Sequence, residues 1–222
     1  MMMKNTIIVI LLVPISVFAQ IDKEQLALKV SKVEVANTLK LKGFIWKRHT
    51  STSVEGVIKS KVVNELSFDE NGVLQITSIS TESSVKKKRG IRGAKQKSAM
   101  EDNADYVESA LNIAMAYTYT SKGQLLDFFE KATITEQGNV LVVTAINVNM
   151  QGDKLTIVLD KESNLYISRK FSSLMGNDLI EGEIKYEKFS SGINHVSETI
   201  INLPAKKAKI TAVNQDYSQR IN

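Results

Sequence analysis

The spacing of hydrophobic residues first predicts a helix near the start of the chain. Asp22 and Gln25 have the spacing of a capping box, in which the two side chains satisfy backbone donors at a helix N-terminus. Leu26 and Val30 then follow at helical spacing, with further apolar residues after them. We therefore expect a first helix over about residues 23–39.

The pattern then changes to a period of two, which is typical of half-buried strands. Apolar and polar residues alternate over residues 44–49 and again over residues 57–68. Residues 69–72 read Asp-Glu-Asn-Gly, and Asn and Gly tolerate the positive φ of a tight turn. We expect a hairpin here, with residues 73–79 as its return strand.

A helical segment interrupts the strands in the middle of the chain. Ser98 and Glu101 again have capping-box spacing, and they precede an apolar stripe over residues 107–117. Ser121 has the position of an N-cap for a second, short and strongly apolar helix. The region 98–131 is thus predicted to be helical.

In the last ninety residues, apolar and polar positions alternate and turns recur every 8–12 residues. This pattern predicts consecutive hairpins of one antiparallel sheet. Together with the helices, this indicates an α+β protein in which a curved sheet holds a small group of helices. The expected strands cover residues 140–145, 155–159, 165–171, 180–187, 195–202 and 207–215.

Residues 1–19 have the order of a secretory signal peptide. Lys4 precedes a short apolar run at residues 7–13, and the run ends on small residues before Gln20. We expect cleavage there and a mature single domain, residues 20–222, in the periplasm or secreted. The chain has no cysteine, so it can use neither disulfides nor a lipid attached to cysteine at the cleavage site.

A basic loop is expected over residues 83–97. The full chain has a net charge of +5, and the predicted leader contributes one of these positive charges through Lys4. The loop holds more positive charge than the mature chain's whole surplus, so the rest is net negative. An anionic membrane surface is one candidate partner, a solvated loop without a partner is the alternative, and nucleic acid is disfavoured because no aromatic residues are interleaved. The basic residues are Lys86, Lys87, Lys88, Arg89, Arg92, Lys95 and Lys97.

Two resemblances follow from these features. The order of helix, hairpin strands, inserted helices and long meander resembles the periplasmic lipoprotein-carrier (LolA-type) family. That resemblance implies a half-barrel whose concave face is covered by helices, with an apolar cavity for acyl chains. Four local strings resemble an uncharacterised family of exported bacterial proteins, to which no activity is attached: LKGFIWKR (41–48), FDENGVL (68–74), KRGIRGA (88–94) and NQDY (214–217).

A set of aromatic and aliphatic residues could line such a cavity between the helices and the sheet. Each buried methylene of an acyl chain contributes about 0.8 kcal/mol without requiring a directed partner. Ordinary core packing is the alternative for the same residues, because protein interiors are close-packed. The candidates are Phe44, Trp46, Leu111, Tyr117, Leu125, Phe128 and Phe129.

The sequence contains no recognisable catalytic or metal centre. His49 and His195 belong to different predicted strands, and no cofactor-binding motif is present. Ser191 with His195 is the nearest candidate for a hydrolase, but the segment reads as a turn between strands. Glu181, Glu183 and Glu187 alternate along one strand, as on a solvated face.

Two functions remain open on this basis. One is a binding or carrier protein for a lipidic or apolar ligand, with residues 98–131 as a lid and the basic loop on a membrane surface. The other is an envelope structural or interaction protein with a filled core that acts through its basic loop. The sequence does not determine the oligomeric state.

Overall fold

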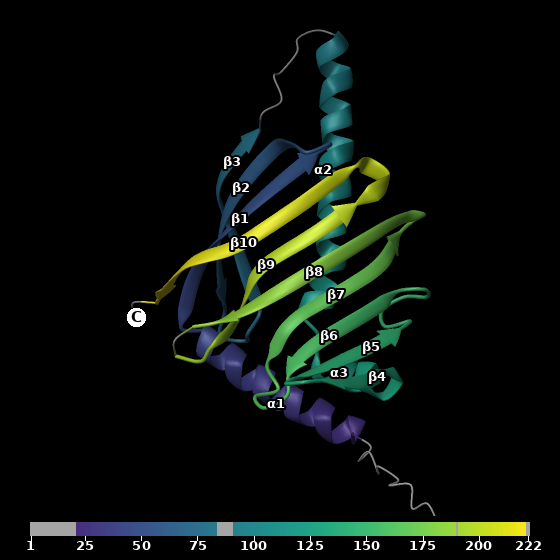
Figure 1. Ribbon diagram of the computed structural model, residues 1–222. Coiled ribbons are helices and arrows are strands. Elements are labelled where there is room, and N and C mark those ends of the chain that lie inside the picture. Colours follow the sequence, from purple (N-terminus) through teal and green to yellow (C-terminus); the bar gives the residue numbers. More distant parts are fainter. Residues whose placement is uncertain (1–20, 84–90, 190, 221–222) are drawn as a thin grey trace, which may run out of the picture.

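The computed structural model describes residues 21–83, 91–189 and 191–220, and for residues 91–104 it describes the backbone. Ten strands form one antiparallel sheet in the order β3-β2-β1-β10-β9-β8-β7-β6-β5-β4 (Figure 1). The predicted α+β class with a curved antiparallel sheet is confirmed. The strands are β1 Phe44–Val54, β2 Val57–Phe68, β3 Leu74–Ser83, β4 Thr133–Gln137, β5 Val140–Ile146, β6 Lys154–Asp160, β7 Tyr166–Met175, β8 Asp178–Lys188, β9 Asn194–Leu203 and β10 Ala208–Gln219.

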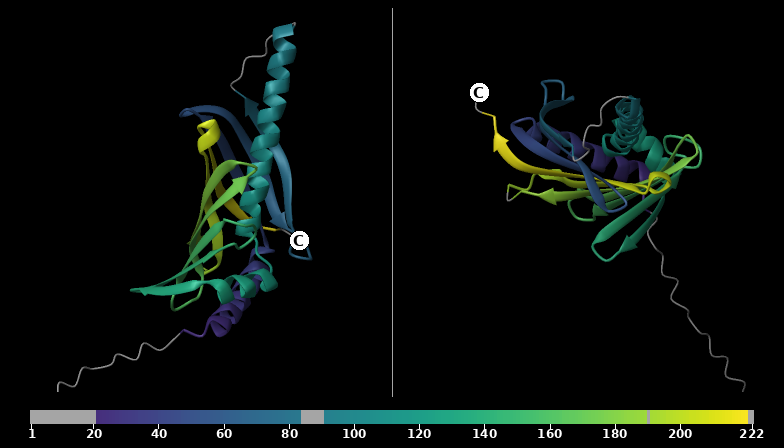
Figure 2. Two further views of the ribbon diagram at one scale, coloured as in Figure 1. Left: turned by 90° about the vertical axis from the view of Figure 1, so that its right-hand side faces the viewer. Right: turned by 90° about the horizontal axis from the view of Figure 1, so that it is seen from above.

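The three α-helices lie on the same side of this sheet, over its concave face (Figure 2). They are α1 Lys23–Leu41, α2 Ile91–Thr118 and α3 Lys122–Lys131, and a short 3₁₀ turn, η1 Pro204–Lys206, joins β9 to β10. The helix α1 crosses the lower end of the sheet, and α2 runs along the concave face (Figure 1). This arrangement is the half-barrel that the resemblance implied.

Local chemistry explains where the helices begin and where the chain turns. The Asp22 carboxylate accepts a hydrogen bond from the Gln25 amide, and Ser121 with Gln124 forms a complete capping box at α3. Between β2 and β3 the Asp69 carboxylate accepts from the amides of Asn71 and Val73. The predicted hairpin turn at residues 69–72 is confirmed, because these bonds satisfy the turn backbone.

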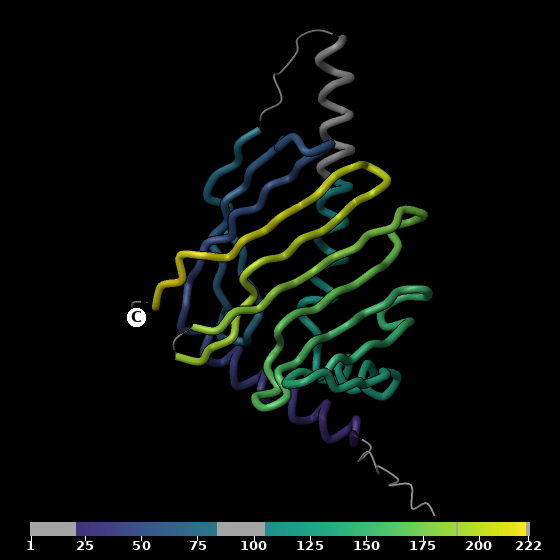
Figure 3. The backbone as a smooth tube through the Cα atoms, viewed as in Figure 1, coloured from purple at the N-terminus to yellow at the C-terminus, as the bar shows by residue number. Residues whose placement is uncertain are grey.

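The sheet brings together two strands that are far apart in the sequence. The last long strand, β10, pairs antiparallel with β1, so the N-terminal hairpins and the C-terminal meander become one surface (Figure 3). Register shifts occur between Ile45 and Lys47 in this pairing and between Val63 and Asn64 in β2–β3. Such bulges bend a strand and increase its twist, which fits the strong curvature of this part of the sheet.

Two hydrophobic clusters fill the space between helices and sheet. The larger one joins α1, α2 and α3 to strands β5–β10, and it contains Phe129, Leu155, Ile157 and Ile184, all 0% exposed. The smaller one consists of Leu41, Trp46, Leu66, Phe68 and Ile193 near the β1–β2 end. The unequal sizes of these clusters decide where a cavity remains.

The helical region differs from the prediction in one respect. The helix α2 begins at Ile91, not at Ser98, so Arg92, Lys95 and Lys97 lie on a helix and the expected loop over 83–97 is too long. The stretch 91–97 lacks proline, so nothing stops the backbone from continuing the helical turns N-terminally. Lys86, Lys87, Lys88 and Arg89, like the predicted leader 1–19, lie outside the described residues. The short edge strand β4 was not predicted.

Candidate functional site

A cavity of about 620 Å³ lies between α1 and the concave face of the sheet. We call it the α1 cavity. Its walls are residues of α1, residues 118–122 from the end of α2 to the start of α3, and residues from β1, β2, β8, β9 and β10 and the start of β7. Its volume falls within the range of about 300–1,000 Å³ that is typical of small-molecule sites. The residues around it come from both ends of the chain, because β10 pairs with β1.

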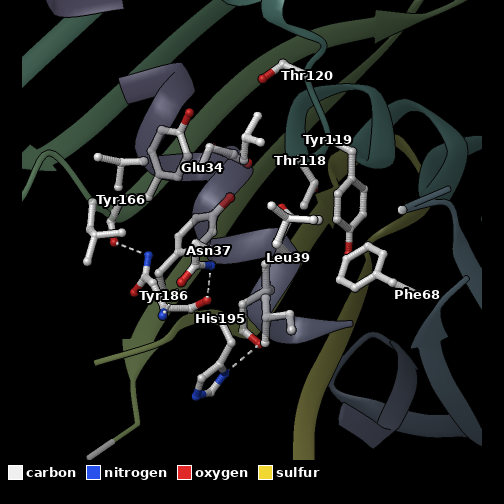
Figure 4. A pocket seen from close by; sticks show the side chains of 18 of the residues that line it. Glu34, Asn37, Leu39, Phe68, Thr118, Tyr119, Thr120, Tyr166, Tyr186 and His195 are labelled. Carbon is white, nitrogen blue, oxygen red and sulfur yellow. Dashed lines mark hydrogen bonds between the residues drawn. The ribbon is translucent and has the colours of Figure 1, made fainter. Parts of the chain in front are cut away.

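One wall of the cavity is α1, which is fixed to the sheet by a pair of hydrogen bonds. The Asn37 side chain donates to the Asn194 carbonyl at 2.6 Å and accepts from the Asn194 amide at 2.7 Å (Figure 4). Asn194 is buried, and its own side chain donates to the Tyr166 carbonyl. This double contact sets the height of α1 above the strands and therefore the width of the cavity.

Aromatic rings form the end of the cavity near β1. Trp46 stacks on Tyr217 with ring centroids 5.4 Å apart, and it lies against Phe68 at 5.5 Å. His195 contacts Tyr217 at 4.5 Å and stacks on Phe189 at 4.3 Å. Burial lowers the pKa of His195 from its ordinary value of 6.5, so the neutral imidazole is favoured here. The result is a rigid, largely apolar surface.

The opposite end of the cavity lies above a buried arginine. Arg169 is completely buried; its guanidinium donates to the carbonyls of Tyr117 and Thr118 at the C-terminus of α2. This contact satisfies carbonyls that have no partner within the helix. Arg169 also forms an ion pair with Glu34 of α1 at 3.4 Å. One cation therefore joins α1, α2 and β7 directly below the cavity.

Two tyrosines beside Arg169 face the cavity opposite Tyr119 and Phe68 (Figure 4). The Arg169 guanidinium lies 3.9 Å from the centre of the Tyr166 ring and 5.9 Å from that of Tyr186. Burial raises the pKa of both phenols, so they remain neutral in the physiological range. The cavity thus has aromatic walls, and these two tyrosines add no charge to it.

The structure distributes the predicted cavity residues over two environments. Trp46 lines the α1 cavity, and Phe44 packs against the neighbouring small cluster. Tyr117 stacks on Phe171 at 4.5 Å and donates to the Asp153 carboxylate at 2.5 Å. The remaining four pack in or against the large cluster between helices and sheet: Leu111, Leu125, Phe128 and Phe129. Ligand contact by these residues stays a prediction.

The candidates for catalysis lie apart from one another or in solvent. Ser191 belongs to the tight turn between β8 and β9, which is closed by bonds between Phe189 and Ile193 and between Gly192 and Phe189, in agreement with the turn predicted there. Glu183 pairs with Lys170 at 3.2 Å, and Glu181 and Glu187 are exposed. Within the residues that the structure describes, no group of three or more metal-ligating side chains is found.

Several cavity residues could not be identified from the sequence. Glu34 and Asn37 are polar positions on an amphipathic helix, and Tyr166 and Tyr186 are ordinary strand residues. Tyr217 belongs to the string NQDY, which carries a resemblance to an exported family but predicts no site. Their common feature is that they line the α1 cavity, and no local pattern in the sequence predicts that position.

No family model matches the sequence, and no curated protein matches it at a significant level. Among solved structures, a DUF1329 family protein from Desulfovibrio piger matches with 11% identity and a TM-score of 0.42, over 90% of this chain and 92% of that chain. A LolA superfamily protein from Nitrosomonas europaea matches with 12% identity and a TM-score of 0.36, over 88% and 94%. A putative outer membrane lipoprotein-sorting protein domain from Vibrio parahaemolyticus matches with 11% identity and a TM-score of 0.40, over 88% and 94%.

The predicted likeness to LolA-type half-barrels therefore recurs among solved structures. At these identities and TM-scores it describes a similar course of the chain and carries no information about a ligand. Among the helices of the described residues, none is both long and apolar enough to cross a bilayer.

Proposed function

We propose that this protein is an extracytoplasmic binding or carrier protein that holds an apolar or amphiphilic ligand in the α1 cavity. The observation that carries the proposal is the cavity itself, about 620 Å³ of open space between α1 and an aromatic part of the sheet. Helices and sheets normally pack against each other to crystal-like density, so a space of this size between α1 and the sheet is the feature that a bound ligand would explain.

The chemistry of the walls suits a ligand with an aliphatic part. Trp46, Phe68 and Tyr217 offer rigid rings, and contact with rings requires no directed hydrogen bond. Each methylene transferred from water to such a surface contributes about 0.8 kcal/mol. Thr118, Thr120 and Ser121 also line the cavity and carry hydroxyl groups, beside which a polar end of the ligand can be accommodated.

The proposed location follows from the predicted leader at residues 1–19. A chain that is cut before Gln20 is released outside the cytoplasm, and it offers no cysteine for lipid attachment at that point. A diffusing protein with an apolar cavity can shield a poorly soluble ligand from water. Binding without chemical conversion is the role that this arrangement supports.

The test is uptake of a fluorescent fatty-acid probe by the delipidated protein. Thr38 lines the cavity from α1, whereas its neighbour Ala36 is exposed and does not line it. We expect Thr38→Trp to fill the cavity and weaken probe binding by at least about tenfold, which corresponds to about 1.4 kcal/mol. Ala36→Trp places the same ring on the same helix and is expected to bind within twofold of the unchanged protein.

Thermal unfolding of both variants shows whether the fold is kept. The proposal fails if the unchanged protein takes up no probe, or if Thr38→Trp binds as well as Ala36→Trp. Native mass spectrometry of protein purified from its own host then identifies a co-purifying ligand by its mass.

A further inference from the structure

The rim of the α1 cavity exposes apolar side chains that lie side by side. Val35 and Leu39 are one turn apart on α1 and are 57% and 59% exposed, and Tyr119 after α2 is 37% exposed. All three line the cavity, and Leu39 and Tyr119 face it in Figure 4. Large exposed apolar residues scattered singly are normal, but three at the mouth of one cavity form a patch.

The same side of α1 carries lysines. These lysines are Lys29, Lys32 and Lys40. Successive helix residues are turned by about 100° around the axis, so the three lysines fall within a sector of about 140° together with Val35 and Leu39. The buried residues Leu26, Val30 and Leu41 lie on the other side of the helix, toward the sheet. We call the combined set the mouth patch; it consists of Lys29, Lys32, Val35, Leu39, Lys40 and Tyr119.

The charge of this surface is positive and not neutralised locally. Lys29, Lys32 and Lys40 are exposed, and in the part of the chain that the structure describes none of them forms an ion pair. Of the two acids on α1, Glu34 is directed to Arg169 and Glu24 lies in the first turn. Lys42 is excluded from the patch, because its ammonium group donates to the Glu70 carbonyl.

We propose that the mouth patch docks on the surface of an anionic lipid bilayer, so that a ligand passes between bilayer and cavity without crossing water. The proposal rests on the proposed function for the ligand and on the mouth patch for the partner. Exposed apolar residues beside lysines combine apolar burial with electrostatic attraction, the two interactions that hold a protein surface at an anionic membrane. The apolar side chains enter the headgroup region, and the lysines contact anionic headgroups.

The test measures co-sedimentation with vesicles of phosphatidylglycerol and phosphatidylcholine (3:7), and with phosphatidylcholine alone. The apolar variant is Val35→Ser with Leu39→Ser. Its matched control is Ile76→Ser with Ile79→Ser, which removes two residues of similar exposure (47% and 52%) from β3, away from the cavity. All proteins have the same N-terminus and the same basic segment 86–97, so contributions from those regions are common to them.

We expect the unchanged protein and the β3 control to bind anionic vesicles, and the Val35/Leu39 variant to bind at least fivefold more weakly. Lys29→Ser with Lys32→Ser is expected to lose about fivefold per lysine on anionic vesicles. Its control, Lys154→Ser with Lys209→Ser, removes the same charge from exposed sheet positions and is expected to bind as the unchanged protein. Binding should weaken as the salt concentration rises.

Four results would overturn the docking proposal. The unchanged protein does not bind vesicles, or it binds neutral vesicles as well as anionic ones. A mouth variant loses no vesicle binding, or it loses no more than its control variant does. Probe uptake without vesicles separates this outcome from failure of the proposed function. If docking alone is wrong, the unchanged protein still binds the probe. If carriage alone is wrong, the vesicle binding still depends on Val35 and Leu39.

Discussion

The two ends of the sheet differ in how far their side chains are buried. Every second residue of strands β5 and β6 is buried, because one face of this half of the sheet packs in the large cluster beneath the helices. In β3, at the other end, every residue after Leu74 is exposed. One continuous sheet therefore has a covered half and an open half.

The difference explains where the cavity lies. In the covered half, rings such as Phe129 fill the space between helices and strands. Toward β1 and β2 the helical cover becomes thinner, and the few aromatic residues of the small cluster do not reach α1 everywhere. The α1 cavity lies between the covered half and the open half, where the curved sheet moves away from α1 and side chains do not fill the space between them.

The largest contrast is expected between core substitutions in the two halves. Phe129→Ala removes a ring that is 0% exposed, and we expect the free energy of unfolding to fall by about 3–5 kcal/mol. Ile79→Ala in β3 removes a side chain that is 52% exposed and should cost less than about 0.5 kcal/mol. Urea unfolding measures both, and equal losses would show that β3 is covered in solution.

A smaller effect is expected from a glycine in the covered half. A Cβ at Gly182 would lie 2.0 Å from Cε1 of Phe171, so Gly182→Ala must displace that ring from its stack with Tyr117. We expect a loss of about 1–3 kcal/mol, as for other overpacked cores. Gly123→Ala in α3 meets no atom within 4 Å and should be neutral or stabilising by up to about 1 kcal/mol. Similar melting temperatures of the two variants would contradict this packing.

The smallest effect concerns pH and the border between the halves. Because burial lowers the pKa of His195 from 6.5, the unfolded chain binds a proton at higher pH than the folded protein does. The free energy of unfolding should therefore decrease as the pH falls below about 6.5, and His195→Gln should remove this part of the decrease. Chemical unfolding of both proteins between pH 7.5 and 5 measures the difference, and the contribution of His195 is expected to be constant above about pH 7. Parallel curves would mean that His195 is hydrated in solution.

Much of the local structure could be predicted from individual residues. The boundaries of β2 agree with the expected strand at residues 57–68, and Ser121 caps α3 as expected. These elements depend on hydrogen bonds and periodicities within a few residues. The start of α2 could not be placed, because Ser98 offers a capping signal that competes with continued helical propensity from Ile91.

The candidate site was predictable only in part. Trp46 lines the α1 cavity, and its contact with a ligand stays a prediction, whereas Tyr117 has the same aromatic signal and is packed against Phe171 and Asp153. An aromatic residue is equally favourable in a core and in a binding site, since both remove apolar surface from water. The sequence therefore cannot separate the two.

The sequence by itself determined the order of helices and hairpins, the antiparallel sheet and the turns, since these follow from periodicity and capping over short distances. The tertiary structure decided that β10 pairs with β1, that Asn37 and Arg169 fix α1 above the sheet, and that space remains beneath it. These features depend on the distance between the curved sheet and the straight helix that crosses it. That separation is a property of the whole packed surface, and no short segment of the chain contains it.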